Sequence, residues 1–144
     1  MRVRDIMTPD PAWCTPASTA REAATLMREH DCGSIPVVQS EQNRNLVGTV
    51  TDRDLAIRAI ADGKHYGETV REFLTTQLII VTPDMSTVDA AKLMAYHQVR
   101  RLPVVEGDNL VGIVSLGDLA VKESSDKRIG DTLEGISEGV KITH

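Results

Sequence analysis

The chain contains one sequence pattern twice, and this duplication constrains the fold more than any other feature. VRDIM at Val3 corresponds to VREFL at Val70, and TPASTAREAATLM at Thr15 corresponds to TPDMSTVDAAKLM at Thr82, both at an offset of 67 residues. The offset falls to 64 residues between GTVTDRDLA and GIVSLGDLA, which begin at Gly48 and Gly112. Because loop tips tolerate insertions, we assign the difference to a polar loop between two strands.

Each copy is expected to contain a strand, a helix, two strands and a second helix. Thr19 with Glu22, and Ser86 with Asp89, form capping-box patterns before apolar residues at helical spacing. The segments IPVV and LPVV are followed by LVGTV and LVGIV, which predicts two short apolar strands at hairpin distance. The GTVT and GIVS ends lead directly into the last helix.

The duplication predicts a fold in which each copy needs the other to cover its sheet. One small sheet with two helices leaves a strand face uncovered, whereas two copies related by a pseudo-twofold axis can pack sheet on sheet. We therefore predict an α/β (α+β) fold with two repeats, each a three-stranded sheet with two helices. The predicted limits are 3–62 and 70–122 for the repeats, with a linker at 63–69 and a C-terminal tail at 123–144. Ile129, Leu133 and Ile136 predict a short amphipathic helix in that tail.

Composition excludes several classes of partner. Sixteen basic and 21 acidic residues give a net charge of −5, which argues against nucleic acid and against an anionic membrane surface. No apolar run approaches the ~20 residues of a membrane span, and the first residues lack the apolar stretch of a secretory signal. We expect a cytoplasmic protein with no nucleic-acid or membrane partner.

A hydroxyl and a carboxylate stand three residues apart at the start of the last helix in each copy, as Thr51–Asp54 and Ser115–Asp118. One interpretation is helix capping, in which the two side chains bond two free backbone amides. The other is ligand binding, because free amides at a helix start attract anions and a carboxylate can accept two hydrogen bonds from a ribose diol. The two interpretations are compatible. Gly48 and Gly112, which precede these residues, permit close backbone approach.

The order TPxxST–helix–M, [IL]PVV and LVG[IT]V[ST]xxDLA, present twice over residues 3 to 122, resembles a tandem pair of CBS domains, the Bateman module. The chain is similar to the short stand-alone CBS-pair proteins of bacteria. This resemblance implies a regulatory protein without catalytic residues or a resident cofactor. It implies binding of AMP, ADP, ATP or a related adenosyl compound, a homodimer, and an unidentified protein target that reads the conformation. A structural or protein-interaction module with vestigial clefts is the alternative.

The resemblance also implies two ligand clefts, each built from both copies, with the hydroxyl directed to phosphate or ribose and the aspartate to the ribose hydroxyls. The first cleft would contain Thr51, Asp54, Leu78, Ile79, Ile80, Arg100 and Arg101. The second would contain Ser115, Asp118, Pro11, Ala12, Trp13, Gly33, Ser34 and Ile35.

The two implied clefts differ in chemistry. Arginine binds phosphate oxygens bidentately, so we expect the first cleft, with Arg100 and Arg101, to hold a phosphorylated ligand better. The alternative is that these arginines are solvated surface charges. Trp13 takes the place that Ile80 has in the other copy. Its indole could stack on a base, fill the second cleft, or serve as a core or interface anchor.

The histidines and cysteines are not expected to form a metal or redox site. His30 and His97 occupy equivalent positions near the ends of two helices, where they favour the helix dipole, and we expect no metal site. Cys14 and Cys32 are not spaced as CxxC, so a redox or zinc motif is not expected, whereas a disulfide between them remains open. No catalytic motif of the common hydrolase, metalloprotease or nucleotide-binding types occurs.

Overall fold

The computed structural model describes residues 1–122, which form two compact units. The β4–β5 unit contains residues 1–11, 79–106 and the described residues from 111 on, and the β2–β3 unit contains residues 12–78 and 107–110. Each unit therefore takes most of its residues from one sequence copy. It also contains the segment with which the other copy begins, residues 3–11 in the β4–β5 unit and residues 70–78 in the β2–β3 unit. The limits proposed for the repeats stay a prediction, and the amphipathic helix proposed for the tail lies outside the described residues.

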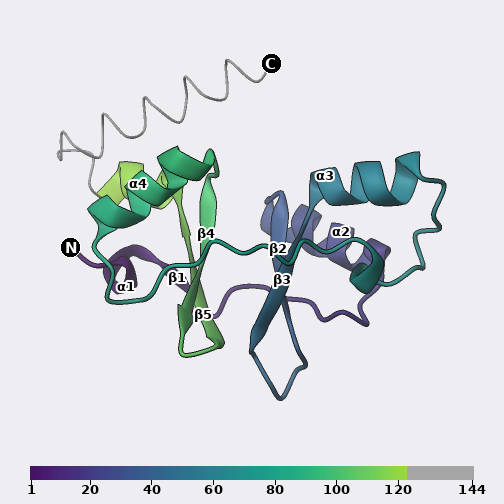
Figure 1. Cartoon of the computed structure of the whole chain (residues 1–144), viewed down its shortest axis with the longest axis horizontal. Helices are drawn as coiled ribbons and strands as arrows, with labels where there is room; N and C mark the ends of the chain where they lie inside the picture. Colours follow the sequence, from purple (N-terminus) through teal and green to yellow (C-terminus); the bar gives the residue numbers. More distant parts are fainter. Residues whose placement is uncertain (123–144) are drawn as a thin grey trace. The chain divides into compact units, whose positions relative to one another are not determined.

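The β4–β5 unit contains a three-stranded sheet in the order β1–β5–β4 (Figure 1). Its elements are α1 (Val3–Ile6), β1 (Thr8–Pro9), α4 (Thr87–His97), β4 (Arg101–Glu106), β5 (Asn109–Ser115) and α5 (Leu116–Lys122). Strand β1 comes from the first copy and pairs antiparallel with β5, where Thr8 lies opposite Ile113 and Pro9 opposite Gly112. The first copy thus supplies an edge of the sheet that the second copy builds.

The β2–β3 unit has a related arrangement with the copies exchanged, but its sheet has two strands, β2 and β3, instead of the three predicted. Its elements are α2 (Ala20–His30), β2 (Ser34–Val38), β3 (Leu46–Thr51), α3 (Asp52–Asp54), the π-helical segment η1 (Leu55–Ala61) and the 3-10 turn η2 (Val70–Glu72). Strands β2 and β3 pair antiparallel, and Thr75 of the second copy forms an antiparallel bridge to Thr49. The last helix of this copy therefore begins as α3 and then widens to π geometry, which the sequence pattern did not predict.

The mixed α/β class is confirmed, but the first strand predicted in each copy is shorter than expected. It is reduced to one residue that bridges a neighbour in parallel, Cys14 to Val37 and Val81 to Val104. Pro16 and Pro83 follow two residues later, and proline has no amide hydrogen with which to extend the ladder.

The predicted hydroxyl caps of α2 and α4 are present, but the return bond from the acidic side chain that would complete each capping box is not formed among the described residues. The hydroxyl of Thr19 accepts a hydrogen bond from the amide of Glu22 at 3.1 Å, and the hydroxyl of Ser86 accepts one from the amide of Asp89 at 3.1 Å. Both helices end at a residue in the left-handed conformation, at Asp31 and at Gln98. These two positions are again equivalent in the repeat, so the same local signals start and stop both helices.

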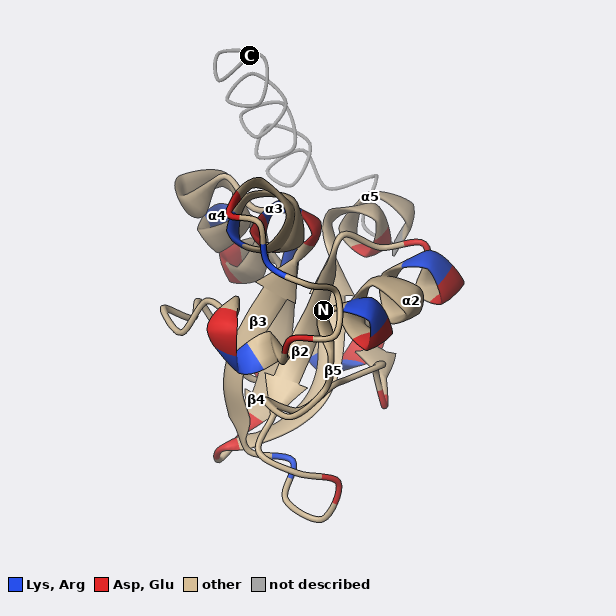
Figure 2. Ribbon diagram, turned by 90° about the vertical axis from the view of Figure 1, so that its right-hand side faces the viewer, with Lys and Arg blue, Asp and Glu red and all other residues tan. Residues whose placement is uncertain are grey.

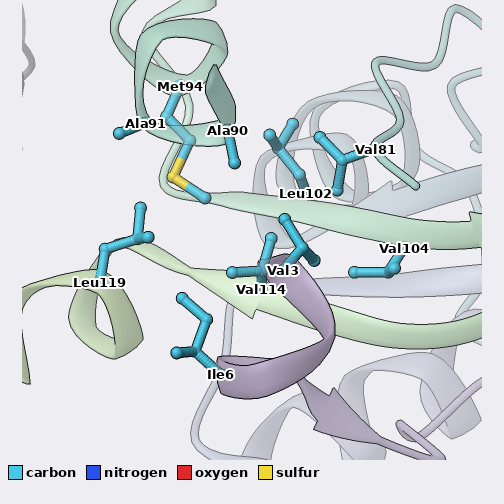
Figure 3. Packing of buried hydrophobic residues seen from close by; sticks show 10 residues of the cluster. All are labelled: Val3, Ile6, Val81, Ala90, Ala91, Met94, Leu102, Val104, Val114 and Leu119. Carbon is cyan, nitrogen blue, oxygen red and sulfur yellow. The ribbon is translucent and has the colours of Figure 1, made fainter. Parts of the chain in front are cut away.

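Each unit has its own hydrophobic core. Figure 3 shows side chains from α1, α4, β4 and β5 converging in the β4–β5 unit, with Met94 of α4 above Val114 and Leu119. The β2–β3 unit has an equivalent core around Phe73, which is 1% exposed. Valine, isoleucine, alanine and methionine supply most of both cores, as the low aromatic content requires.

Charged side chains lie mainly on helices and loops. Figure 2 shows blue and red together on α2, whereas the strands are mostly tan. Strands β2, β3 and β5 contain no charged residue, and β4 has charges only at its ends, at Arg101 and Glu106. The apolar strands are therefore available to build the cores.

Candidate functional site

The candidate site in the β2–β3 unit is centred on the start of α3. Thr51 ends β3 in an extended conformation, and its hydroxyl accepts a hydrogen bond from the amide of Asp54 at 3.0 Å. In return, the Asp54 carboxylate accepts one from the amide of Thr51 at 3.0 Å. The two side chains thus form a complete capping box, which confirms the capping interpretation for this copy.

The equivalent site in the β4–β5 unit has the same geometry. The hydroxyl of Ser115 accepts a hydrogen bond from the amide of Asp118 at 3.1 Å, and the Asp118 carboxylate accepts one from the amide of Ser115 at 3.1 Å. Both carboxylates are therefore fixed at the end of a strand by the same pair of local bonds.

The surroundings of the two carboxylates differ. The Asp54 side chain is only 12% exposed, and the hydroxyl of Thr75 donates to its two oxygens at 3.3 and 3.4 Å. The Nε atom of Arg58 lies 3.9 Å from the same carboxylate. Among residues 1–122, Asp118 has no comparable side-chain donor. No sequence motif points to Thr75 or Arg58, although the repeat places Thr75 in register with Thr8.

Three residues of the second predicted cleft lie beside Thr51 in the β2–β3 unit. Ser34 lies opposite Thr51 in the β2–β3 pair, and the carbonyl of Gly33 accepts a hydrogen bond from the amide of Asp52 at 2.9 Å. Ile35 is 1% exposed and belongs to the core, so its side chain is unavailable to a ligand.

The two arginines of the first predicted cleft lie beside Ser115 in the β4–β5 unit. The carbonyl of Arg100 accepts a hydrogen bond from the amide of Leu116 at 2.8 Å, and Arg101 begins β4 next to the end of β5. Both arginines are exposed. Within each unit, the start of the helix after the hairpin therefore lies beside the beginning of the first hairpin strand, which is β2 or β4. The pairing of residues from different copies in one cleft stays a prediction.

The remaining predicted residues lie on two extended segments. Leu78, Ile79 and Ile80 precede the Val81 bridge, and their backbone groups make no hydrogen bond within the described part of the chain. Pro11, Ala12 and Trp13 occupy the equivalent place before the Cys14 bridge, also without backbone hydrogen bonds to described residues. Free backbone donors and acceptors of this kind suit recognition of a planar base edge.

Trp13 contributes its side chain to a hollow within the β2–β3 unit. The hollow has a volume of about 510 Å³ and is lined by Trp13, Cys14, Ser18, Thr19, Arg21, Glu22, Thr25 and Leu26. The guanidinium of Arg44 lies 4.2 Å from the centre of the indole ring. The indole thus makes a cation–π contact with Arg44, and Trp13 lines the hollow together with residues of α2. Its proposed relation to the second cleft stays a prediction.

The two cysteines are both free, which answers the disulfide question. Burial, with a smaller contribution from the charge of Glu22, raises the pKa of the Cys14 thiol from 9.0 to about 12. Cys32 is only half-buried, and its thiol donates to the carbonyl of Ser34 at 3.5 Å.

We expect Cys14 to resist alkylation in the folded protein, because the thiolate is the reactive species and burial suppresses it. At pH 8, iodoacetamide should label Cys32 at least tenfold faster than Cys14, as measured by mass spectrometry of peptides. Unfolding in guanidinium should remove the difference. The raised pKa also stabilises the fold below pH 9, and this contribution should fall as the pH rises towards about 12. Equal labelling rates in the folded protein would contradict this description.

His30 and His97 are exposed residues in the last turns of α2 and α4. Within residues 1–122, no group of three or more histidine, cysteine or acidic side chains could hold a metal ion. None of the helices in that range has the length and apolarity needed to cross a membrane.

The geometry defines a tandem-repeat protein with one hydroxyl–carboxylate helix start in each unit. Comparison with known proteins assigns it to a family: the model of the CBS domain matches residues 3–60 and 70–123. The chain is 47% identical over 135 residues to the CBS domain-containing protein YhcV of Bacillus subtilis, with 94% of each chain covered. The chain therefore belongs to the CBS domain family and contains two such domains, which confirms the resemblance.

Two similar solved structures contain adenosyl ligands. CBSX2 in complex with AMP is 29% identical, with a TM-score of 0.75 over 86% of this chain and 96% of that chain. The CBS domain pair of MJ0100, in complex with 5′-methylthioadenosine and S-adenosyl-L-methionine, is 28% identical, with a TM-score of 0.75 over 87% of this chain and 97% of that chain.

Proposed function

We propose that this protein is a regulatory module that binds an adenine nucleotide or another adenosyl compound and signals by a shift in conformational population. The observation that supports the proposal most is the pair of fixed carboxylates, Asp54 and Asp118, each at the end of a strand within a complete capping box. An aspartate held in this way can accept hydrogen bonds from the two hydroxyls of a ribose. The complexes of CBSX2 with AMP and of MJ0100 with adenosyl ligands support the ligand class.

We propose positions for the base and the phosphate of the ligand from residues at equivalent places in the two copies. We place the base against the free backbone of Leu78, Ile79 and Ile80 in one site and of Pro11, Ala12 and Trp13 in the other. Arg100 and Arg101 are exposed cations that can bind phosphate oxygens bidentately. The site of Thr51 and Asp54, completed by these arginines, should therefore bind a phosphorylated ligand more tightly than the site of Ser115 and Asp118.

The mechanism requires only a modest difference in affinity. A ligand that prefers one arrangement of the two units shifts their equilibrium by its differential binding free energy, and a coupling of about 1–3 kcal/mol is sufficient. A cytoplasmic homodimer whose conformation is read by a protein target is the form in which we propose that the module acts.

A thermal-shift panel tests the ligand class. The full chain is heated with AMP, ADP, ATP, NAD, S-adenosylmethionine or divalent metal ions in turn. A ligand present at a hundredfold excess over its Kd stabilises the fold by about 2.7 kcal/mol, which raises the Tm by roughly 5–10 °C for a protein of this size. We expect such a rise with at least one adenosyl compound, with guanosine and inosine monophosphates as controls. A flat panel would contradict the proposal and favour a structural or protein-interaction module.

A further inference from the structure

The Asp54 carboxylate is already occupied by the protein's own donors. We name Asp54, Arg58 and Thr75 the Asp54 cluster. One oxygen of Asp54 accepts the amide of Thr51 at 3.0 Å and also the Thr75 hydroxyl at 3.3 Å. The other oxygen lies 3.4 Å from the same hydroxyl and 3.9 Å from Nε of Arg58. With the side chain only 12% exposed, a ribose diol that approaches both oxygens would compete with the Thr75 hydroxyl for them.

The bonds from Thr75 are weak enough to be displaced. A hydroxyl has a single hydrogen to donate, and here it is shared between two oxygens at distances longer than the usual 2.7–2.8 Å. Two ribose hydroxyls would each donate a full hydrogen bond to a charged acceptor. The exchange of donors at Asp54 therefore favours the ligand, at the cost of the Thr75 contact.

Thr75 belongs to the segment that begins the second sequence copy. Its backbone exchanges two hydrogen bonds with Thr49, at 2.8 and 3.0 Å. Arg58 donates to the carbonyls of Phe73 and Leu74, both at 3.3 Å. The Asp54 cluster therefore connects the proposed ligand carboxylate with residues 70–75, the segment of the second copy that packs in the first copy's unit.

The other unit offers a control. Asp118 corresponds to Asp54, and Thr8 corresponds to Thr75. Thr8 is exposed, and its hydroxyl makes no hydrogen bond to Asp118 or to any other described residue. The contact between threonine and carboxylate is thus present in one unit and absent from the other.

We infer that Thr75 sets the affinity of the Asp54 site: ligand binding there breaks the Thr75–Asp54 contact and loosens residues 70–75. This inference rests on the proposed function, because it needs a ligand at Asp54. It explains how binding is coupled to a conformational change. Part of the binding free energy is consumed in breaking the contact, and the released segment belongs to the copy that does not contain Asp54.

The test uses the full chain in an Asp118→Asn background, so that the Asp54 site dominates binding, and isothermal titration with AMP. Thr75→Val keeps the shape of the side chain and removes the hydroxyl, whereas Thr75→Ser keeps the hydroxyl. Because one net hydrogen bond is no longer broken on binding, Thr75→Val should bind AMP ~2- to 10-fold more tightly. Thr75→Ser and Thr8→Val should stay within about twofold of the background.

A second readout separates this role from a structural one. Thr75→Val should lower the Tm of the free protein while it raises AMP affinity, and a purely structural Thr75 would not produce these opposite signs. Amide hydrogen exchange of residues 70–75 should become faster when AMP saturates the background protein. Unchanged or weaker AMP binding by Thr75→Val, or exchange that does not respond to AMP, would overturn this inference alone. Absence of binding by AMP and by every other adenosyl compound of the thermal-shift panel, in every variant, would count against the proposed function and this inference together.

Discussion

Replacing Gly48 with alanine should lower the free energy of unfolding by about 3 kcal/mol, the upper end of the ~1–3 kcal/mol typical of a group added to a packed interior. A Cβ atom at Gly48 would lie 2.7 Å from the backbone oxygen of Thr75 and 2.7 Å from Cδ1 of Leu74. The leucine side chain could rotate, but the carbonyl is fixed by the paired hydrogen bonds between Thr49 and Thr75. The substitution must therefore displace the segment of the second copy.

Gly112 should behave in the same way in the other unit. A Cβ atom there would lie 2.7 Å from the sulfur of Met7 and 3.0 Å from the backbone oxygen of Thr8. Because the methionine is flexible and the oxygen contact is longer, we expect a smaller loss, about 1–2 kcal/mol.

Gly117 provides the control for both substitutions. It lies in α5, and the nearest atom to an added Cβ is the Ser115 hydroxyl at 3.7 Å. Since alanine favours helix more than glycine does, Gly117→Ala should leave stability unchanged or raise it by up to about 1 kcal/mol. Urea denaturation of the three variants measures the differences. If Gly48→Ala were as stable as the unsubstituted protein, the close contact between Gly48 of β3 and the backbone of Thr75 would be contradicted.

These glycines show where sequence reasoning succeeded and where it stopped. From the sequence, Gly48 and Gly112 were expected to allow close backbone approach to a ligand. In the structure, the backbone that approaches them is the protein's own, from the other copy. A repeated sequence identifies equivalent positions, but it does not show whether a segment packs within its own copy or in the other one.

Local signals were more informative than long-range ones. The hydroxyls of Thr19 and Ser86 accept hydrogen bonds from amides only three residues further along the chain, so the helix starts could be predicted from sequence. The capping boxes at Thr51 and Ser115 have the same local origin. The Asp54 cluster could not be predicted in this way, because Thr75 is 21 residues from Asp54 in the chain.

Trp13 illustrates a further limit. Its place in the repeat is equivalent to that of Ile80, and this identifies the extended segment on which it lies. Its indole contacts Arg44, which lies in the loop between β2 and β3. That loop differs in length between the copies, so the repeat carries no information about the contact.

Replacing both Asp54 and Asp118 with asparagine should weaken AMP binding by about 10- to 100-fold, because hydrogen bonds to a charged acceptor contribute roughly 1.5–3 kcal/mol. Asparagine preserves the size of the side chain and one acceptor oxygen, so each capping box can be kept. Asp89→Asn is the matched control, since Asp89 has the same position relative to the capping Ser86 but is exposed on α4. The single variants rank the sites: Asp54→Asn should cost more than Asp118→Asn.

Isothermal titration of AMP into the double variant, the Asp89→Asn control and the unsubstituted protein is the most direct test of the claim that these two carboxylates hold the sugar of an adenosyl ligand. We expect the double variant to lose most of its affinity while circular dichroism and Tm remain close to those of the control. AMP binding of equal strength in the folded double variant would contradict the claim and leave Asp54 and Asp118 as helix caps alone.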